Sequence, residues 1–295
     1  MGKPRRSFWF HGRAIATAPL AVFALAWTPA LSPSARAAVG WAGAEVCEAG
    51  PSGAAELNAA GIRSLAFAPF GRPEIGWEIY LPLIAHEIGT RCDPRTPAFA
   101  ADLAAWQSAH GMAPGGVVDA ATFAAMRTAW QARRPFVDAS HRACPAPPAE
   151  TRLAMVPAGL SYGGKVMQLR AGALAAYEAM RSAARAEDPR IAADGRLMML
   201  FSAYRSPQFD AARCAREGNC QGIVRASCSA HRTGLAMDLY LGAAPGLAPD
   251  SSADANRLFI SRGPAYRWMV LNASRFGFVN YPFEPWHWEW TGEPI

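Results

Sequence analysis

The chain has 295 residues, of which 51% are hydrophobic and 18% are charged, with 24 prolines and 26 glycines. This composition excludes a disordered chain and a fibrous repeat, and it predicts a globular protein with room for one large domain or two small ones. The formal net charge is +6 and the pI is near 9.2. Such a charge would fit nucleic-acid binding only if it persisted in the folded part of the chain.

Much of the positive charge lies in residues 1–37, which have the pattern of an export signal. A cationic start is followed by an uncharged stretch over residues 14–31 and by a small-x-small cleavage pattern that ends at Ala37. Five of the 29 Lys and Arg residues lie in this segment and no Asp or Glu does, which leaves 24 cations against 23 anions in the rest. The remainder is close to neutral, so we expect no nucleic-acid partner.

A membrane anchor is the alternative to a cleaved signal, because the uncharged stretch approaches the shortest membrane span of about 17 residues. Pro19 and Pro29 within the stretch, and the cleavage pattern after it, favour cleavage. The sequence Arg5-Arg6-Ser7-Phe8 resembles a twin-arginine export signal, while Pro4 and Trp9 leave the ordinary secretory route open. We therefore expect an exported protein, periplasmic or associated with the cell wall, with no membrane span after cleavage.

Six cysteines form an even set that is available for disulfides in an exported protein. Six allow fifteen pairings, and the sequence does not choose among them. Pairing Cys47 with Cys92 would stay within the first domain, and pairing Cys214 with Cys220 would close a short loop, which leaves Cys144 with Cys228. A zinc–cysteine site is the alternative, although the chain has no Cys-x-x-Cys pair.

Helical periodicity predicts a small N-terminal domain of three short helices over residues 38–135. Thr96 is expected to cap a helix that ends at Gly111, and Asp119 is expected to cap a second helix. An apolar stretch over residues 79–88 supplies a third helix, which starts or breaks near Pro82. The apolar residues at helical spacing are Phe99, Leu103, Trp106, Phe123, Met126 and Trp130.

This portion resembles the peptidoglycan-binding-like three-helix module found beside many cell-wall hydrolases. The residues that carry the resemblance are Leu103-x-x-Trp106-Gln107, His110-Gly111 and the run from Gly115 to Phe123. Two roles stay open for the module: binding of the wall polymer, and packing without any ligand.

A proline-rich linker over residues 136–150 favours extended backbone and marks the domain boundary. Residues 151–295 then mix helices and strands. Helices are expected around Leu174 to Met180, from Ser206-Pro207, and over 264–276 before Gly277; strands are expected over 197–204, 236–241 and 286–290. Because this order does not alternate strictly, we expect an α+β fold with an antiparallel sheet.

The residues with the strongest chemical pattern lie in this second domain. A catalytic zinc ion takes three protein ligands and keeps one position open for water. His231, Asp238 and His287 would supply two imidazoles and one carboxylate. His231 is expected on an approach loop, and Gly234 would let the chain turn before Asp238 enters a strand.

Glu284, three residues before His287, is the expected general base. On an ideal strand the two side chains would face opposite sides. Pro285 disfavours a strand at this point, so Glu284 can lie in a loop and reach a water molecule whose pKa zinc lowers to about 7. Glu289 is the other nearby acid, but it follows His287 and is ranked well below Glu284.

Three motifs in order resemble those of the VanY-type zinc D-alanyl-D-alanine carboxypeptidases, which are relatives of VanX dipeptidases and of some phage endolysins. The motifs are Ser202-Ala-Tyr-Arg205-Ser206, Ser229-x-His231-x-x-Gly-x-Ala-x-Asp238 and Glu284-Pro-Trp-His287, and the resemblance spans residues 155–291. It implies one Zn(II) per chain held by His231, Asp238 and His287, with Glu284 as base and Arg205 stabilising the carbonyl oxygen. The implied substrate is the D-alanyl-D-alanine end of peptidoglycan stem peptides.

Ser229 and Trp286 lie within these motifs and are further candidates for substrate contact. Trp286, Trp288 and Trp290 would share one face of a strand, and core packing is expected for at least two of them. Trp290 stands where family members often place a tyrosine, and Cys214, Cys220 and Cys228 lie where the family has no expected cysteines. The single histidines His86, His110 and His141 are assigned no function.

The sequence thus predicts an exported zinc D,D-carboxypeptidase with a helical module as a candidate wall anchor. One alternative has the same zinc site but cleaves a different peptide bond: a D,D- or L,D-endopeptidase that acts on cross-linked wall. Another is a non-catalytic wall-binding protein with structural zinc, against which Glu284 argues, because a structural site needs no base and usually has four ligands. A nucleotide enzyme and a serine hydrolase both lack their motifs, and the oligomeric state is not predicted.

Overall fold

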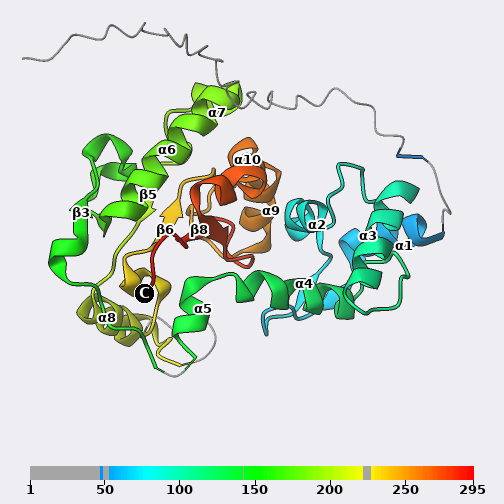
Figure 1. Ribbon diagram of the computed structural model, residues 1–295, viewed down its shortest axis with the longest axis horizontal. Coiled ribbons are helices and arrows are strands. Elements are labelled where there is room, and N and C mark those ends of the chain that lie inside the picture. Colours follow the sequence, from blue (N-terminus) through cyan, green and yellow to red (C-terminus); the bar gives the residue numbers. More distant parts are fainter. Residues whose placement is uncertain (1–46, 49–52, 142, 222–226) are drawn as a thin grey trace, which may run out of the picture. The chain divides into compact units, whose positions relative to one another are not determined.

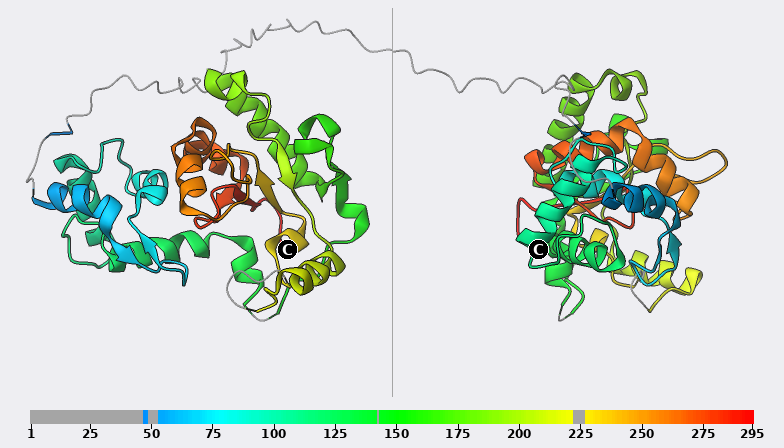
Figure 2. Two further views of the ribbon diagram at one scale, coloured as in Figure 1. Left: turned by 180° about the vertical axis from the view of Figure 1, so that it is seen from behind. Right: turned by 90° about the vertical axis from the view of Figure 1, so that its right-hand side faces the viewer.

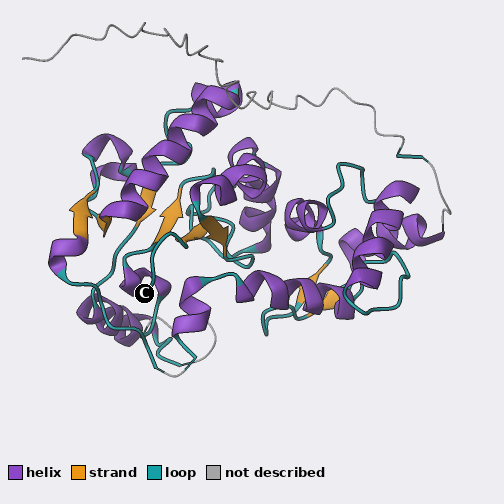
Figure 3. Cartoon of the chain, in the orientation of Figure 1, coloured by secondary structure: helices purple, strands orange, loops and turns teal. Residues whose placement is uncertain are grey.

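The computed structural model describes residues 47–48, 53–141, 143–221 and 227–295. The predicted signal segment and its cleavage site lie outside these residues. Within the described ranges, no helix has both the length and the apolar character that a membrane crossing requires. Figure 3 shows that the described chain is largely helical and that its strands are short.

The N-terminal part is mostly helical. Its elements are α1 (Gly53–Ser64), β1 (Ala66–Phe67), β2 (Glu74–Ile75), the 3-10 helix η1 (Glu78–Tyr80), α2 (Leu81–Glu87), α3 (Pro97–Ala109), α4 (Ala120–Ala132) and α5 (Pro135–Ala139). The side chains of Thr96 and Asp119 accept the backbone N–H groups of Phe99 and Thr122, so α3 and α4 begin at the predicted caps. Helix α2 begins at Leu81, next to Pro82, as expected.

Aromatic packing holds these helices together. The predicted apolar residues of α3 and α4 are all buried. Trp77 stacks on Phe99 with ring centroids 6.2 Å apart, and Tyr80 meets Phe123 edge-on at 4.7 Å. Gly116 turns the chain between α3 and α4 with a φ of +66°, and a Cβ there would lie 2.5 Å from the carbonyl oxygen of Ala100, so only glycine fits.

The N-terminal part differs from the expectation in two places. Helix α1 and the antiparallel β1–β2 pair were not predicted, so the segment has more elements than a three-helix module. Helix α5 occupies the start of the predicted extended linker, because Pro135 stands at its first turn, where proline is pre-organised for a helix. Residues 143–149 of that linker, before the 3-10 helix η2 (Glu150–Arg152), lack helical structure.

The second part has the α+β character that was expected. One antiparallel sheet has the strand order β5-β6-β8-β7, and β3 pairs with β4 separately. The strands are β3 (Leu153–Met155), β4 (Gln168–Arg170), β5 (Leu200–Ser202), β6 (Ala236–Leu239), β7 (Phe278–Asn280) and β8 (His287–Trp290). The α-helices are α6 (Ala171–Glu187), α7 (Pro189–Ala193), α8 (Pro207–Glu217), α9 (Asp254–Arg262) and α10 (Pro264–Asn272), and the 3-10 helices are η3 (Ala158–Leu160), η4 (Tyr162–Gly164), η5 (Ala230–Thr233) and η6 (Ala273–Phe276).

One face of the sheet packs against helices. Helices α6 and α10 contact each other and lie side by side in opposite views of the molecule (Figures 1 and 2). Trp288 of β8 meets Tyr266 of α10 edge-on, and the ring of Trp290 lies against Gly172 of α6. Because side chains alternate along a strand, His287 and Glu289, which alternate with these tryptophans in β8, face the other side.

Several predicted elements are shorter than expected. The strand expected over 197–204 is reduced to β5, because Met198 has a φ of +64° and lies in a turn rather than in an extended segment. The helix expected over 264–276 is α10 followed by η6, which ends at Gly277 as expected. The last strand begins at His287, so Trp286 lies in the preceding turn and does not share a strand face with Trp288.

Buried polar contacts join the N-terminal helices to the second part, and the described residues all belong to one compact unit. The guanidinium of Arg257 on α9 is fully buried, pairs with Glu74 at 3.1 Å and donates to the hydroxyl of Tyr80. It also donates to the carbonyl of Phe283 at 2.9 Å. Burying this charge is tolerable because several acceptors satisfy it at once.

All six cysteines are paired, so no zinc–cysteine site exists. The disulfides are Cys47–Cys92, Cys144–Cys228 and Cys214–Cys220, the set proposed from spacing and elimination. The second of these ties the segment after α5 to the residue before Ser229, at the edge of the candidate site.

Candidate metal centre and active site

Three strands place the central groups of the site on one face of the sheet. Asp238 of β6 is the Cα partner of His287 on β8, and on its other side it is paired with Ser202 of β5. Directly paired residues of adjacent strands carry their side chains on the same face. Sequence-distant residues are therefore brought together by strand pairing alone.

His231 reaches the same place from a 3-10 turn rather than from a loop. It lies in η5, whose cap Ser229 accepts the backbone N–H of His231 at 3.3 Å. Gly234 ends the turn with a φ of +70°, the reversal expected from the sequence, and β6 follows. The ring Nδ1 of His231 lies 2.7 Å from the carbonyl oxygen of Ala203 and, as an N–H donor to it, leaves Nε2 free to act as a ligand.

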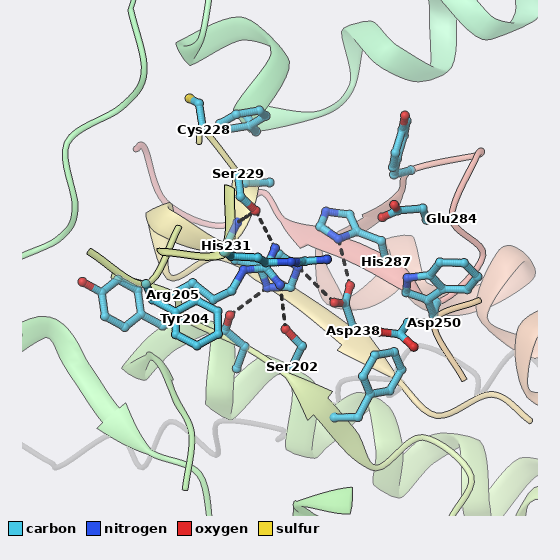
Figure 4. Close-up of a pocket in the computed structure, with 18 of the residues that line it drawn as sticks. Ser202, Tyr204, Arg205, Cys228, Ser229, His231, Asp238, Asp250, Glu284 and His287 are labelled. Carbon is cyan, nitrogen blue, oxygen red and sulfur yellow. Dashed lines mark hydrogen bonds and ion pairs between the residues drawn. The ribbon is translucent and has the colours of Figure 1, made fainter. Parts of the chain in front are cut away.

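The two imidazoles meet at the carboxylate of Asp238 (Figure 4). Nε2 of His231 lies 3.2 Å from one carboxylate oxygen, and Nδ1 of His287 lies 2.9 Å from the other. Each of the three residues offers one ligand atom, and these atoms lie within 4.8 Å of one another. In the part of the chain that the structure describes, no other group of three His, Cys, Asp or Glu residues meets this description.

The buried charges of the cluster shift its pKa values in different directions. Burial, together with the positive charge of Arg205, lowers the pKa of His231 to about 4. Burial acts in the same direction on His287, but hydrogen bonds to Asp238 and Glu289 outweigh it and raise the pKa of His287 to about 9. Burial would raise the pKa of Asp238, but the two histidines hold it well below its usual range.

Glu284 lies beside this cluster in a turn, as predicted from Pro285. Its backbone N–H donates to Tyr281 at 2.9 Å, and its carbonyl accepts from the N–H of His287 at 2.8 Å. These tight turns put Glu284 and His287 on the same side, and Figure 4 shows the carboxylate of Glu284 pointing toward the His287 ring. Burial raises the pKa of Glu284, so this acid holds its proton more readily than an ordinary glutamate does.

Arg205 lines the same pocket as His231. Two of its guanidinium nitrogens donate to the hydroxyls of Ser202 at 3.0 Å and Ser229 at 2.7 Å. The buried carboxylate of Asp210 lies 3.5 Å from its Nε. These contacts fix the orientation of the guanidinium fork.

A pocket of about 900 Å³ opens over these groups, a size that suits a small ligand. The candidate residues Arg205, Ser229, His231, Asp238, Glu284, Trp286 and His287 all line it. Gln131, Arg134 and Phe136, from the N-terminal helices and the segment after them, line it as well.

Sequence reasoning did not anticipate the pair of Arg134 and Glu289 at the site, and it considered Glu289 only as a poor alternative base. Glu289 is buried and its carboxylate lies 3.3 Å from Nε2 of His287, while Arg134 pairs with Glu289 at 2.5 Å. A signal for Glu289 was available, because a residue two positions after His287 on a strand shares its face. No local pattern indicated Arg134, which is 155 residues away in the sequence.

The three other histidines that the structure describes, His86, His110 and His141, lie outside this cluster. His110 stacks on Trp106 with ring centroids 3.9 Å apart, and burial lowers the pKa of His86. His141 is exposed at the end of α5.

Comparison with known protein families gives one assignment for the second part of the chain. The family described as VanY, D-alanyl-D-alanine carboxypeptidase, matches residues 166–293. No curated protein matches the chain. The matched residues begin after the N-terminal helices and include every candidate site residue, from Arg205 to His287. The chain therefore carries a domain of the VanY family of D-alanyl-D-alanine carboxypeptidases.

Proposed function

We propose that this chain is an exported, zinc-dependent D-alanyl-D-alanine carboxypeptidase that hydrolyses the terminal peptide bond of peptidoglycan stem peptides. Its family domain is of the carboxypeptidase type. The observation that carries the proposal is the convergence of His231, Asp238 and His287 beside Glu284, a carboxylic acid with a raised pKa, in one pocket.

The donor set of the cluster fits Zn(II). Two imidazole nitrogens and one carboxylate oxygen are ligands that zinc prefers, and three protein ligands leave one position open in a tetrahedral site. The contact from Nδ1 of His231 to the Ala203 carbonyl supports this fit, because metal-binding histidines usually donate their other ring N–H to the protein. One ion per chain would be held by His231, Asp238 and His287.

A bound zinc ion would lower the pKa of a water molecule to about 7 and polarise the scissile carbonyl. Glu284 would accept the proton of the attacking water on its carboxylate and pass it to the leaving amine of D-alanine. Its raised pKa suits this exchange, since a general base works best when its pKa lies near the working pH.

Arg205 would donate hydrogen bonds to the carbonyl oxygen as negative charge develops there. The hydroxyls of Ser202 and Ser229 hold its guanidinium in place, so the donor would not need to reorganise during the reaction. Ser229 would thus act on the substrate through Arg205, while Trp286 would form a wall of the pocket beside Glu284.

Export is part of this proposal. Disulfides persist in oxidising compartments, and all six cysteines of this chain are paired. The cationic start, uncharged stretch and cleavage pattern of residues 1–37 support the same location, outside the cytoplasm and next to peptidoglycan.

The test is release of D-alanine from a synthetic stem pentapeptide by the zinc-loaded protein, with and without a chelator. The matched variants are Glu284→Gln and the exposed Glu178→Gln on α6. We expect chelation to abolish release, and Glu284→Gln to lower it by about 10²–10⁴-fold with the zinc content unchanged, while Glu178→Gln has no effect.

If the protein binds zinc but releases no D-alanine, the carboxypeptidase assignment is wrong. Cross-linked peptidoglycan is then the substrate to assay, because an endopeptidase would use the same metal site on an internal bond. If neither substrate is cut, the non-catalytic wall-binding protein becomes the leading alternative.

A further inference from the structure

Glu289 shares a face of β8 with the candidate metal ligand His287. The two residues are separated by one position, so their side chains point to the same side of the strand. The carboxylate oxygen Oε1 of Glu289 lies 3.3 Å from Nε2 of His287, and Glu289 is only 1% exposed. A buried carboxylate next to a ring N–H is a strong acceptor for it.

The protein holds this carboxylate from the N-terminal side of the chain. Arg134 donates to Oε1 through Nε at 2.8 Å and through Nη2 at 2.5 Å. The backbone N–H of Phe136 donates to the other oxygen at 3.1 Å. Both oxygens of Glu289 are therefore engaged, which leaves it poorly placed to act as a general base.

Arg134 is itself fixed. Its third nitrogen, Nη1, donates to the side-chain oxygen of Gln131 in α4 at 2.7 Å. Its guanidinium lies over the ring of Tyr281 at 4.1 Å, a cation–π distance. Arg134 is only 7% exposed. Its contacts with Gln131 of α4 and with Tyr281, in the turn before Glu284, therefore fix the orientation of its guanidinium group.

This chain of contacts decides which nitrogen of His287 is available. If Nε2 carries the proton that Glu289 accepts, Nδ1 keeps its lone pair, and Nδ1 is the atom that faces Asp238 at 2.9 Å. His231 has the opposite arrangement, with Nδ1 held by a backbone carbonyl and Nε2 facing Asp238.

We infer that Glu289 is a positioning residue that fixes His287 as an Nδ1 ligand, and that Arg134 and the N–H of Phe136 hold Glu289 in place for this purpose. The segment that joins the N-terminal helices to the VanY-type domain is thus a structural part of the metal site. The inference rests on the proposed function only in taking His231, Asp238 and His287 as the ligands.

A purely structural ion pair is the competing explanation for Arg134 and Glu289. A buried pair can often be replaced by apolar residues of similar volume without loss of stability. The double variant Arg134→Met/Glu289→Met is therefore expected to fold while losing the partner of His287. It separates the two explanations, because a structural pair would leave zinc binding unchanged.

The experiment measures zinc affinity of the full chain by competition with a chelator of known affinity. Glu289→Gln and the Met/Met double variant are expected to weaken zinc binding by about 10–100-fold, as loss of a ligand's hydrogen-bond partner generally does. Arg134→Lys keeps the positive charge but loses the two parallel guanidinium donors to Glu289. It is expected to weaken zinc binding by a smaller factor than Glu289→Gln does. The matched control is Arg133→Met, since Arg133 pairs with Glu87 and has no contact with the site.

A second readout follows the proton on the imidazole directly. In zinc-loaded protein with ¹⁵N-labelled histidine, we expect His287 to carry its proton on Nε2 and His231 to carry it on Nδ1. Glu289→Gln is expected to broaden or shift the Nε2–H signal of His287 and to leave that of His231 unchanged.

The inference is overturned if Glu289→Gln and the double variant fold and bind zinc as tightly as the parent chain, or if His287 carries its proton on Nδ1. The proposed function fails on separate grounds, namely if the parent chain binds no zinc or releases no D-alanine. If the parent chain is active and the variants bind zinc as tightly as the parent, the inference is wrong and the proposed function still stands.

Discussion

Asp238 and His287 are partners across β6 and β8, and their side chains meet at 2.9 Å although they are 49 residues apart in the sequence. The antiparallel register therefore sets the spacing of two candidate metal ligands. His231 lies in the turn that leads into β6, so this turn and β6 together supply two of the three candidate metal ligands. This arrangement is rigid, because Asp238 lies on a strand with a neighbour on each side.

Zinc should stabilise the protein measurably. A ligand at about 100 times its dissociation constant stabilises the folded state by about 2.7 kcal/mol, which for a domain of this size corresponds to a rise in Tm of about 5–10 °C. We expect this rise when zinc is added to chelator-treated protein in a thermal melt. His231→Asn should abolish it and the exposed His141→Asn should preserve it; an equal rise in both variants would rule out the proposed ligand set.

Replacing Arg205 by lysine should impair the chemical step. Lysine cannot donate to Ser202 and Ser229 with two fixed nitrogens at once, so the donor for the developing negative charge would lose its orientation. We expect kcat to fall by about 10²–10³-fold with unchanged zinc content. The control is Arg275→Lys, because Arg275 forms an exposed pair with Glu187 away from the pocket. A change in KM alone would assign Arg205 to substrate binding instead.

The metal-depleted protein should be most stable near pH 6.5. The pKa of His287 is raised to about 9, so its stabilising contribution is complete below about pH 6.5 and is lost as the pH rises through about 9. The pKa of His231 is lowered to about 4, so stability falls between about pH 6.5 and pH 4 as the unfolded chain takes up a proton that the folded chain does not.

Urea denaturation of chelator-treated protein at several pH values checks this profile. In His287→Asn the fall in stability between pH 7 and pH 9 should disappear, while the fall below pH 6.5 should persist. A parent profile that is flat between pH 7 and pH 9 would contradict the raised pKa of His287.

Removing the disulfide between Cys144 and Cys228 should loosen the site as well as the fold. This bond closes a sequence separation of 84 residues, and Cys228 directly precedes Ser229, which caps η5 and holds Arg205. We expect Cys144→Ala/Cys228→Ala to lower the free energy of unfolding by about 2–5 kcal/mol and to reduce kcat. Cys214→Ala/Cys220→Ala, which opens a separation of only 6 residues, should cost less stability.

The sequence predicted several local features of the fold and of the site. Each has a local cause: Thr96 and Asp119 cap helices, Gly234 reverses the chain, and Pro285 keeps Glu284 out of the strand. The family assignment also came from short motifs, and the match over residues 166–293 confirms it. The roles of His231, Asp238, His287, Glu284 and Arg205, and wall binding by the N-terminal helices, stay predictions.

Features that depend on contacts distant in the sequence were not predicted. Glu289 was considered only as a poor alternative base, and its partner Arg134 had no motif. The linker was expected to be extended throughout, yet its first residues form α5 and the N–H of Phe136 reaches Glu289. Met198 adopts a turn conformation, although the apolar residues around it indicated a strand.

The sequence by itself determined the residue types of the candidate metal site, the order of its motifs and the family of the domain, because each depends on the identity and spacing of a few neighbouring residues. Tertiary structure alone decided which nitrogen of His287 faces Asp238, and which part of the chain holds Glu289. Those properties depend on strand register, on the packing of α5 against β8, and on the ion pair between Arg134 and Glu289. They are set by the free energy of the whole fold rather than by any local pattern.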